Sequence, residues 1–274
     1  MSNLSNTSTN QSLFGTDTPV ALVTGSGVAR VGRRVAERFR DAGFRIVLHA
    51  HKSVETAEKL IAAWKQDSAG ASLITGDVSD EEQVSKWRDE IVARYGRLDV
   101  LVNSAAIWEP IALEKATAAD FRHFFDVNAL GTALMNQQFG LLMTHQTHGG
   151  AIVNIGDWST IRPYRDFAPY FPSKASVVSI TQSMAVELAT RNPNIRVNAV
   201  LPGPVLLADE VNQERRQKII QESLLQREGT PDDVAEAAFF LATSPFITGV
   251  CLPVDGGRTI YAGPSADPIA HPKV

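Results

Sequence analysis

Short runs of apolar, mostly β-branched residues recur along the chain and alternate with longer segments of helical period. Within each run the apolar residues are consecutive rather than alternating, which indicates strands that are buried on both faces. Such strands, separated by helices, predict a parallel sheet with helices on both sides and right-handed crossovers. The predicted strands cover residues 20–24, 44–48, 71–75, 98–103, 151–155, 195–200 and 250–254.

Polar start signals precede three of the predicted helices. At Ser79, Thr117 and Thr230 a hydroxyl residue is followed three positions later by an acidic residue, the pattern of a capping box. Pro231 after Thr230 suits the first position of a helix. We therefore expect one α/β domain over residues 19–262, with a Rossmann-like, doubly wound parallel sheet of seven strands.

The two ends of the chain lack this pattern. Residues 1–18 are rich in Ser, Thr and Asn and carry few apolar side chains, so we expect a flexible N-terminal tail. Residues 263–274 contain three prolines and are expected to be irregular.

Composition excludes several classes of function. The 274 residues are 44% hydrophobic and carry a net charge of −4, which gives no basic surface for nucleic acid. No apolar stretch approaches the roughly 18 residues that span a bilayer, and the N-terminus does not resemble a secretory signal. We therefore expect a cytoplasmic protein with no membrane or nucleic-acid partner.

Cysteine and histidine content argues against a metal site or an internal disulfide. Cys251 is the single cysteine and is expected to be a small apolar residue of the last strand. His123, His145 and His148 are not spaced as metal ligands, so we expect no metal.

The turn after the first strand is rich in glycine. Gly25, Gly27 and Gly32 lie between that strand and the following helix. Glycines in this place let the backbone approach a pyrophosphate, which the N-terminus of the helix then binds. The alternative is a tight turn with close helix packing, but the position after the first strand favours a dinucleotide site.

The turn after the second strand bears on the choice of cofactor. An NAD site would place an acidic residue there, but the chain has His49, Lys52 and Ser53. These side chains suit the 2′-phosphate of NADPH, and the alternative is that Lys52 and His51 form a solvated polar face. Asp77 and Val78, after the third strand, are placed to reach the adenine.

Tyr170 and Lys174 are four residues apart at the start of a predicted helix, so both side chains lie on one face. Bringing the pKa of a phenol from about 10 to about 7 requires roughly 4 kcal/mol. One cation about 4 Å away, at an effective dielectric constant near 20, contributes about that much. We therefore expect Lys174 to acidify the Tyr170 phenol.

These motifs together resemble the short-chain dehydrogenase/reductase family over about residues 19–260. In that family the Tyr donates a proton, the Lys orients the nicotinamide ribose and an Asn holds a water in a proton relay. The resemblance assigns these roles to Tyr170, Lys174 and Asn128. It further implies cofactor contacts from Gly25, Arg30, Val31, Gly32, Asn103, Ser104, Ala105, Tyr170, Lys174, Pro202 and Gly203.

Two positions depart from the family pattern. Asn103-Ser104-Ala105-Ala106 stands where the family has Asn-Asn-Ala-Gly, and Asp157 stands 13 residues before Tyr170, where the family has Ser. An ionised carboxylate accepts hydrogen bonds and repels a developing alkoxide, so it suits a substrate that presents an N–H group. A ketone remains possible if burial keeps Asp157 protonated.

Asp157 at this position is typical of the pteridine reductases and the similar dihydromonapterin reductases within the family. In those enzymes an Arg of the glycine turn lies between the cofactor phosphate and the pterin, and an aromatic residue sandwiches the pterin against the nicotinamide. The resemblance assigns these roles to Arg30 and Trp108, although the turn between Gly25 and Gly32 is one residue longer here. Leu206 and Leu207 are expected either to line the substrate pocket or to pack on a helix face.

The sequence thus predicts an NADPH-dependent oxidoreductase that reduces a pterin, with hydride transfer to a ring carbon and proton transfer through Tyr170. The alternative is a ketone or alcohol oxidoreductase, such as a 3-oxoacyl thioester reductase. A non-catalytic dinucleotide sensor is disfavoured, because Tyr170 and Lys174 are both present. By resemblance the protein is expected to be a homotetramer.

Overall fold

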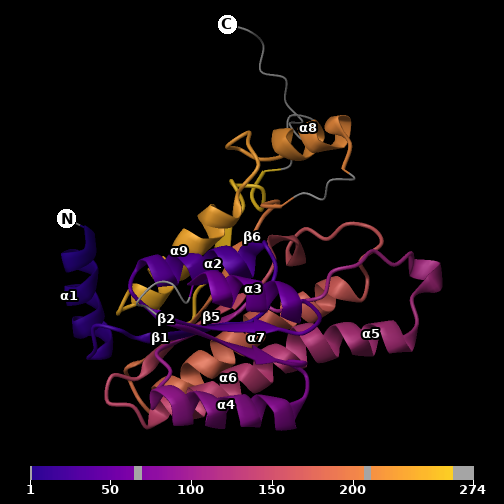
Figure 1. The fold of residues 1–274 in the computed structure, drawn as a ribbon. Coiled ribbons are helices and arrows are strands. Elements are labelled where there is room, and N and C mark those ends of the chain that lie inside the picture. Colours follow the sequence, from indigo (N-terminus) through magenta and orange to yellow (C-terminus); the bar gives the residue numbers. More distant parts are fainter. Residues whose placement is uncertain (1, 65–69, 207–210, 262–274) are drawn as a thin grey trace, which may run out of the picture.

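A parallel sheet forms the centre of the molecule (Figure 1). The computed structural model describes residues 2–64, 70–206 and 211–261, and within them the sheet has seven strands in the order β3-β2-β1-β4-β5-β6-β7. The predicted fold class is confirmed. The strands are β1 (Val20–Val23), β2 (Arg45–Ala50), β3 (Ala71–Thr75), β4 (Val100–Asn103), β5 (Gly150–Ile155), β6 (Ile195–Pro202) and β7 (Cys251–Val254).

Helices cover both faces of the sheet. Figure 1 shows α2, α3 and α9 over one face and α4, α6 and α7 over the other. The helices are α1 (Ser2–Phe14), α2 (Val31–Asp41), α3 (Val54–Trp64), α4 (Glu81–Tyr95), α5 (Ala118–Phe124), α6 (Gly131–Thr144), α7 (Tyr170–Ala189), α8 (Gln213–Gln221) and α9 (Pro231–Thr243). Short helical turns are η1 (Leu113–Lys115), η2 (Phe125–Leu130) and η3 (Trp158–Thr160).

The strand order reverses between β1 and β4, the two central strands. The segments that follow these two strands run to opposite faces of the sheet. A crevice therefore opens beyond the carboxyl ends of β1 and β4. Apolar side chains are buried on each face of the sheet, with Phe39 and Phe44 on one side and Trp87 and Phe139 on the other. The rigid sheet therefore presents one edge to which the polar turns are attached.

Two of the three predicted helix starts are confirmed. Thr117 and Thr230 each form a capping box with the acidic residue three positions on. The third was assigned to Ser79 wrongly, because the side chain that caps α4 is that of Asp80, which accepts from Gln83 N at 3.1 Å. The Ser79 hydroxyl instead donates to Asp77 Oδ1 at 2.8 Å.

The N-terminal segment differs from the expected flexible tail, because residues 2–14 form helix α1. Asn10 donates from Nδ2 to the carbonyl oxygen of Ala42 at 3.1 Å, and Phe14 is buried edge-on against Phe44. Phe14 and Leu13 at the end of the helix thus pack a mostly polar segment against the core. The C-terminal segment 263–274, predicted to be irregular, lies outside the described residues.

Candidate active site

The glycine turn after β1 has the close backbone contacts that a phosphate cradle requires. Gly25 has a φ of +64°, and a Cβ there would lie 2.9 Å from Ala105 Cα. A Cβ on Gly32 would lie 2.7 Å from Gly25 O. Arg30, the N-cap of α2, makes no side-chain cap, so the first N–H groups of the helix face the turn uncapped. These features fit the pyrophosphate of a dinucleotide.

The turns after β1 and β4 are joined at this crevice. Thr24 Oγ1 accepts hydrogen bonds from Ser104 N and Ala105 N, both at 2.9 Å. Asn103 is buried and donates to Asn154 Oδ1 at 2.9 Å, while its own Oδ1 is buried without a hydrogen-bond partner among the described residues. The structure thus brings the predicted residues of the fourth-strand motif to the glycine turn.

His49 has a different role from the predicted phosphate contact. Its ring is buried; Nδ1 accepts from Gly25 N at 3.1 Å, and Nε2 lies 3.0 Å from Gly76 O. This pattern requires the neutral tautomer with its proton on Nε2. Burial lowers the pKa of His49 to about 4. Both ring nitrogens are thus bound to backbone groups and are not free for a 2′-phosphate, so the assignment of His49 to that contact is wrong.

Other predicted cofactor residues lie around the same turn. Lys52 is exposed, and Ser53 Oγ lies 2.5 Å from where a Cβ on Gly27 would stand. Val78 is buried, and Asp77 Oδ1 accepts from Ser79 N at 2.9 Å. Lys52 and Ser53 therefore remain predicted contacts with a 2′-phosphate.

The far side of the crevice comes from the carboxyl end of β6. Pro202 ends that strand, and Gly203 N donates to Val254 O at 2.9 Å. A Cβ on Gly203 would lie 2.6 Å from Asp255 Cα, so only glycine fits this contact. Leu206 is exposed, whereas Leu207 lies outside the described residues.

Tyr170 and Asp157, 13 residues apart in sequence, are in direct contact. The Tyr170 hydroxyl donates to Asp157 Oδ2 at 2.6 Å. Asp157 Oδ1 accepts from the backbone N of Ser159 at 2.8 Å and also from the Ser159 hydroxyl. Burial raises the pKa of the Tyr170 phenol well above its ordinary value, and the charge of Asp157 and its hydrogen bond raise it further. The phenol therefore keeps its proton, which it donates in a hydrogen bond to the carboxylate.

Lys174 is buried one helical turn from Tyr170, and its Nζ donates to Ile155 O at 2.5 Å. Burial lowers the pKa of Lys174 to about 8, against the opposing effect of the Asp157 charge. The expected acidification of Tyr170 by Lys174 is not found, because the pKa of the phenol is raised and the ammonium is bound by a carbonyl. Helix α7 begins at Tyr170, so Pro172 lies in its first turn, where proline is tolerated.

Asn128 lies in η2, a single π-helical turn between α5 and α6. Such turns are frequent at functional sites. Its Oδ1 accepts from Ile107 N at 2.9 Å, and its Nδ2 donates to Ile107 O at 3.1 Å and to Ser173 Oγ at 3.0 Å. The side chain therefore joins the loop after β4 to α7 beside Lys174, and its role in a proton relay stays a prediction.

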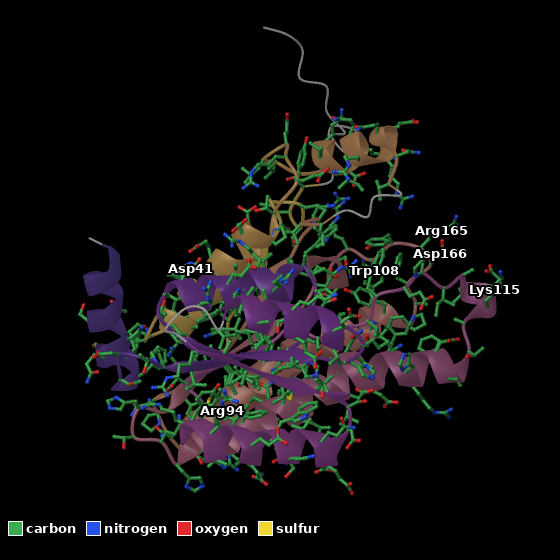
Figure 2. The ribbon with its side chains drawn as sticks, viewed as in Figure 1. Asp41, Arg94, Trp108, Lys115, Arg165 and Asp166 are labelled. Atoms are coloured by element: carbon green, nitrogen blue, oxygen red, sulfur yellow. The ribbon has the colours of Figure 1, made fainter. Side chains whose placement is uncertain are left out.

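Trp108 is half exposed at the mouth of the crevice, and its ring stacks on Phe167 with centroids 5.0 Å apart and planes at 28°. Figure 2 shows it on the same side of the molecule as Arg165 and Asp166. Arg30 is exposed at the start of α2. Both residues lie on turns at the carboxyl edge of the sheet, and their predicted contacts with a pterin remain predictions.

Three residues near the catalytic pair were missed by the sequence analysis. Ser159 is buried on Asp157, and Tyr164 lies close enough to Asp157 for the carboxylate charge to raise the pKa of its phenol, in addition to burial. The guanidinium of Arg258 lies 4.8 Å from the centroid of the Trp158 ring. Strand periodicity and motif spacing carry no signal for these residues, because Ser159 lies in the short turn η3 and Tyr164 and Arg258 lie outside the helices and strands.

Two further predictions concern a membrane-spanning helix and a metal site, neither of which is expected. Within the described residues, none of the helices has both the length and the apolar character needed to cross a bilayer. The same part of the chain holds no group of three or more His, Cys, Asp or Glu side chains that could bind a metal ion. Cys251 lies in β7 as predicted but is half-buried rather than part of the core.

Known proteins resemble the chain over most of its length. The family model described as Enoyl-(Acyl carrier protein) reductase matches residues 27–259. A protein named ketoacyl reductase 2 of the granaticin polyketide synthase, from Streptomyces violaceoruber, is 35% identical over 250 residues, which are 88% of this chain and 96% of that protein. The chain belongs to the short-chain dehydrogenase/reductase family.

Other members of the short-chain dehydrogenase/reductase family support this assignment. The 3-oxoacyl-[acyl-carrier-protein] reductase FabG of Staphylococcus aureus is 31% identical over 244 residues, covering 88% of this chain and 98% of that protein. A crystal structure assigned as a short-chain alcohol dehydrogenase from Sinorhizobium meliloti 1021 superposes with a TM-score of 0.81 at 27% identity, covering 89% of this chain and 97% of the other. The chain is therefore an oxidoreductase of a family that uses NAD(P)(H).

Proposed function

We propose that this short-chain dehydrogenase/reductase uses NADPH to reduce a polarised double bond, with Tyr170 as the proton donor. The observation that carries the proposal is the buried pair of Tyr170 and Lys174 at the start of α7, in a chain that also has the glycine cradle after β1. Gly25 and Gly32 would hold the pyrophosphate at the start of α2, and Lys52 would bind the 2′-phosphate. The cofactor supplies the hydride.

The proton comes from the Tyr170 phenol. Its raised pKa keeps it protonated at neutral pH, so it enters the reaction as an acid. To reach the substrate, the hydroxyl turns its proton from Asp157 toward the substrate atom that gains electron density. Lys174, held by Ile155 O one helical turn away, would orient the nicotinamide ribose, the role that the family resemblance assigns to it.

The relatives favour a ketone as the substrate. Two of them are named as ketoacyl or 3-oxoacyl reductases, which supports reduction of a 3-oxoacyl thioester or a similar ketone here. A ketone oxygen needs a donor, and the hydroxyls of Tyr170 and Ser159 both lie at Asp157. Ketone reduction at this site requires that Tyr170 release Asp157, or that Asp157 carry a proton and donate. We take the ketone as the first candidate.

A specific observation favours a pterin as the second candidate. Asp157 stands where the family has a serine, and a carboxylate accepts hydrogen bonds from the N–H and amino groups of a pterin. Trp108 presents a half-exposed ring at the mouth of the same crevice, on which a flat heterocycle can stack. In this case hydride goes to a ring carbon and Tyr170 protonates the adjacent nitrogen.

One experiment tests the function and separates the candidates. NADPH oxidation by the purified protein is measured with an acetoacetyl thioester and with a dihydropterin, for the wild type, Tyr170→Phe and Asp157→Ser. We expect Tyr170→Phe to lower kcat by about 10²-fold or more with either substrate. Asp157→Ser should improve turnover of the thioester if ketones are the substrate, and should abolish turnover of the dihydropterin if pterins are. Wild-type activity unaffected by Tyr170→Phe would contradict the proposal.

The proposed assembly is an oligomer, as is common in the family, with a tetramer expected by resemblance. The contact faces would include α5, α6 and α7, on which Phe121, Leu141 and Val186 are exposed apolar residues. Light scattering of the purified protein measures the number of subunits.

A further inference from the structure

A second phenol, that of Tyr164, lies beside the catalytic pair and takes no part in the mechanism above. It belongs to the loop 161–169, which connects η3 to α7. Its ring packs edge-on against Phe167, with centroids 5.1 Å apart, and against Phe171 at 4.9 Å. At 44% exposure, part of the Tyr164 side chain remains accessible to a ligand. Two aromatic neighbours therefore orient the ring.

The loop that carries Tyr164 is tied to the loop that carries Trp108. Ile111 N donates to Asp166 O at 2.6 Å, and Ile111 forms a β-bridge with Phe167. Trp108, three residues before Ile111, stacks on the ring of the same Phe167. The two loops thus make one aromatic wall whose members are positioned before a ligand binds, which reduces the entropy lost on binding.

The surroundings of Tyr164 place its hydroxyl among the polar groups of the site. Burial and the charge of Asp157 raise the pKa of the phenol, and the nearby polar groups of Trp108 and Ser159 and the charge of Arg258 act in the opposite direction. Tyr164 also contributes to the raised pKa of Tyr170, after burial and Asp157. Phe167 and Phe171, on which Tyr164 packs, also contact the Tyr170 ring, with centroids 6.1 and 5.4 Å apart.

We propose that Tyr164 binds the substrate and determines specificity, selecting with Trp108 for substrates that carry a planar conjugated ring next to the reducible bond. The proposal rests on the reductase function above, because it places the ring beside the atom that Tyr170 protonates. The class comprises aryl ketones and nitrogen heteroaromatics with a polar atom at the ring edge. A straight-chain acyl group gains nothing from these two contacts, so it is not favoured by them.

The chemistry of the wall explains this selection. The half-exposed Trp108 ring offers a face for stacking, which adds to the burial of apolar area. The Tyr164 hydroxyl can both donate and accept, so it can pair with a ring nitrogen, an amino group or a carbonyl oxygen. A flexible acyl chain can use neither contact and loses more rotational freedom on binding.

The test compares matched substrates on matched variants. Benzoylacetyl and acetoacetyl thioesters differ in a phenyl against a methyl group at the reacting ketone, and a dihydropterin represents the heterocycles. KM and kcat are measured for the wild type, Tyr164→Phe, Tyr164→Leu and the control Tyr95→Phe, whose hydroxyl donates to Ser72 far from the site. We expect Tyr164→Phe to raise KM about tenfold for the ring substrate with a polar edge. Tyr164→Leu should raise KM for both ring substrates, with acetoacetyl unchanged.

A binding measurement keeps this inference separate from the function itself. Quenching of tryptophan fluorescence by the dihydropterin and by benzoylacetyl thioester is titrated with wild type, Tyr164→Leu and Tyr95→Phe, and cofactor affinity is measured alongside. If no substrate is reduced but ring ligands bind more weakly to Tyr164→Leu alone, the reductase function fails and the role of Tyr164 stands. Equal KM and equal ligand affinity in the wild type and both Tyr164 variants would overturn the role of Tyr164, even in an active enzyme.

Discussion

The Tyr170 hydroxyl donates to Asp157 Oδ2 at 2.6 Å, so the proton donor of the site is bound to a carboxylate. A negative charge next to a phenol disfavours phenolate, and burial adds to the effect. Lys174 is not among the groups that shift the pKa of Tyr170, and its ammonium donates to Ile155 O. The ionisation of Tyr170 is therefore controlled mainly by burial and by Asp157.

The substitution Asp157→Asn should lower the pKa of Tyr170, because it removes the charge that raises that pKa and keeps the shape of the side chain. In the direction of alcohol oxidation the phenolate acts as the base, so the rate rises with pH through the pKa of Tyr170. We expect the midpoint of this rise to move to lower pH by about one unit or more.

The pH dependence of NADPH formation from the alcohol product measures this shift, and Asp166→Asn is the matched control. Asp166 is exposed on the same side of the site and has a φ of +69°, which asparagine tolerates. A midpoint that is the same in Asp157→Asn and the wild type would show that Asp157 does not control the phenol.

His49 should make the fold sensitive to acid. Its pKa is about 4 when folded and 6.5 in the reference state, so below about pH 6.5 the unfolded chain binds a proton that the folded chain does not. Stability is therefore lost as the pH falls from about 6.5 to about 4, by about 3 kcal/mol in total. Above that range the contribution is fully present.

Urea unfolding across this pH range measures the effect. His49→Gln removes the titration while an amide can still accept from Gly25 N and donate to Gly76 O, so its stability should depend less on pH. His123→Gln, at an exposed position, should behave as the wild type does. Equal slopes for His49→Gln and the wild type would contradict the prediction.

Lys52→Glu should reverse the cofactor preference. A carboxylate in this turn accepts from the ribose 2′-hydroxyl of NADH and repels the 2′-phosphate of NADPH. We expect the ratio of kcat/KM for NADPH to that for NADH to fall about tenfold or more. Lys115→Glu, an exposed lysine of η1, serves as the control for net charge. An unchanged ratio would place the 2′-phosphate elsewhere.

Arg258 joins α8, the helix after β6, to Trp158, the residue that follows Asp157. Its guanidinium lies against the Trp158 ring, donates to Ile219 O at 2.8 Å and pairs with Glu222 at the end of α8. Arg258→Met should loosen α8 from Trp158, which raises KM for the substrate about tenfold and leaves KM for NADPH unchanged.

Steady-state kinetics with both substrates varied in turn separate these effects. Arg215→Met changes an exposed arginine of α8 itself and should leave both constants as in the wild type. If Arg258→Met raises KM for the cofactor as well, or for neither, Arg258 does not position the substrate side of the crevice.

Local patterns predicted much of the fold because they act over a few residues. Continuous apolar runs identified the strands, and the Thr117 and Thr230 caps followed from side chains three positions apart. Ser79 was assigned wrongly because two neighbouring residues can both cap a helix, and the contact with Asp77 decided between them. The N-terminal helix was missed because its anchor, Phe14, binds a surface made by distant residues.

By itself, the sequence determined the alternation of strands and helices, the glycine turn after β1 and the four-residue spacing of Tyr170 and Lys174, because each depends on local geometry. Only the tertiary structure decided that His49 is enclosed and neutral and that Tyr170 donates to Asp157. The pKa and the partner of a side chain depend on burial and on charges brought together from distant segments. Spacing along the chain does not encode these distances.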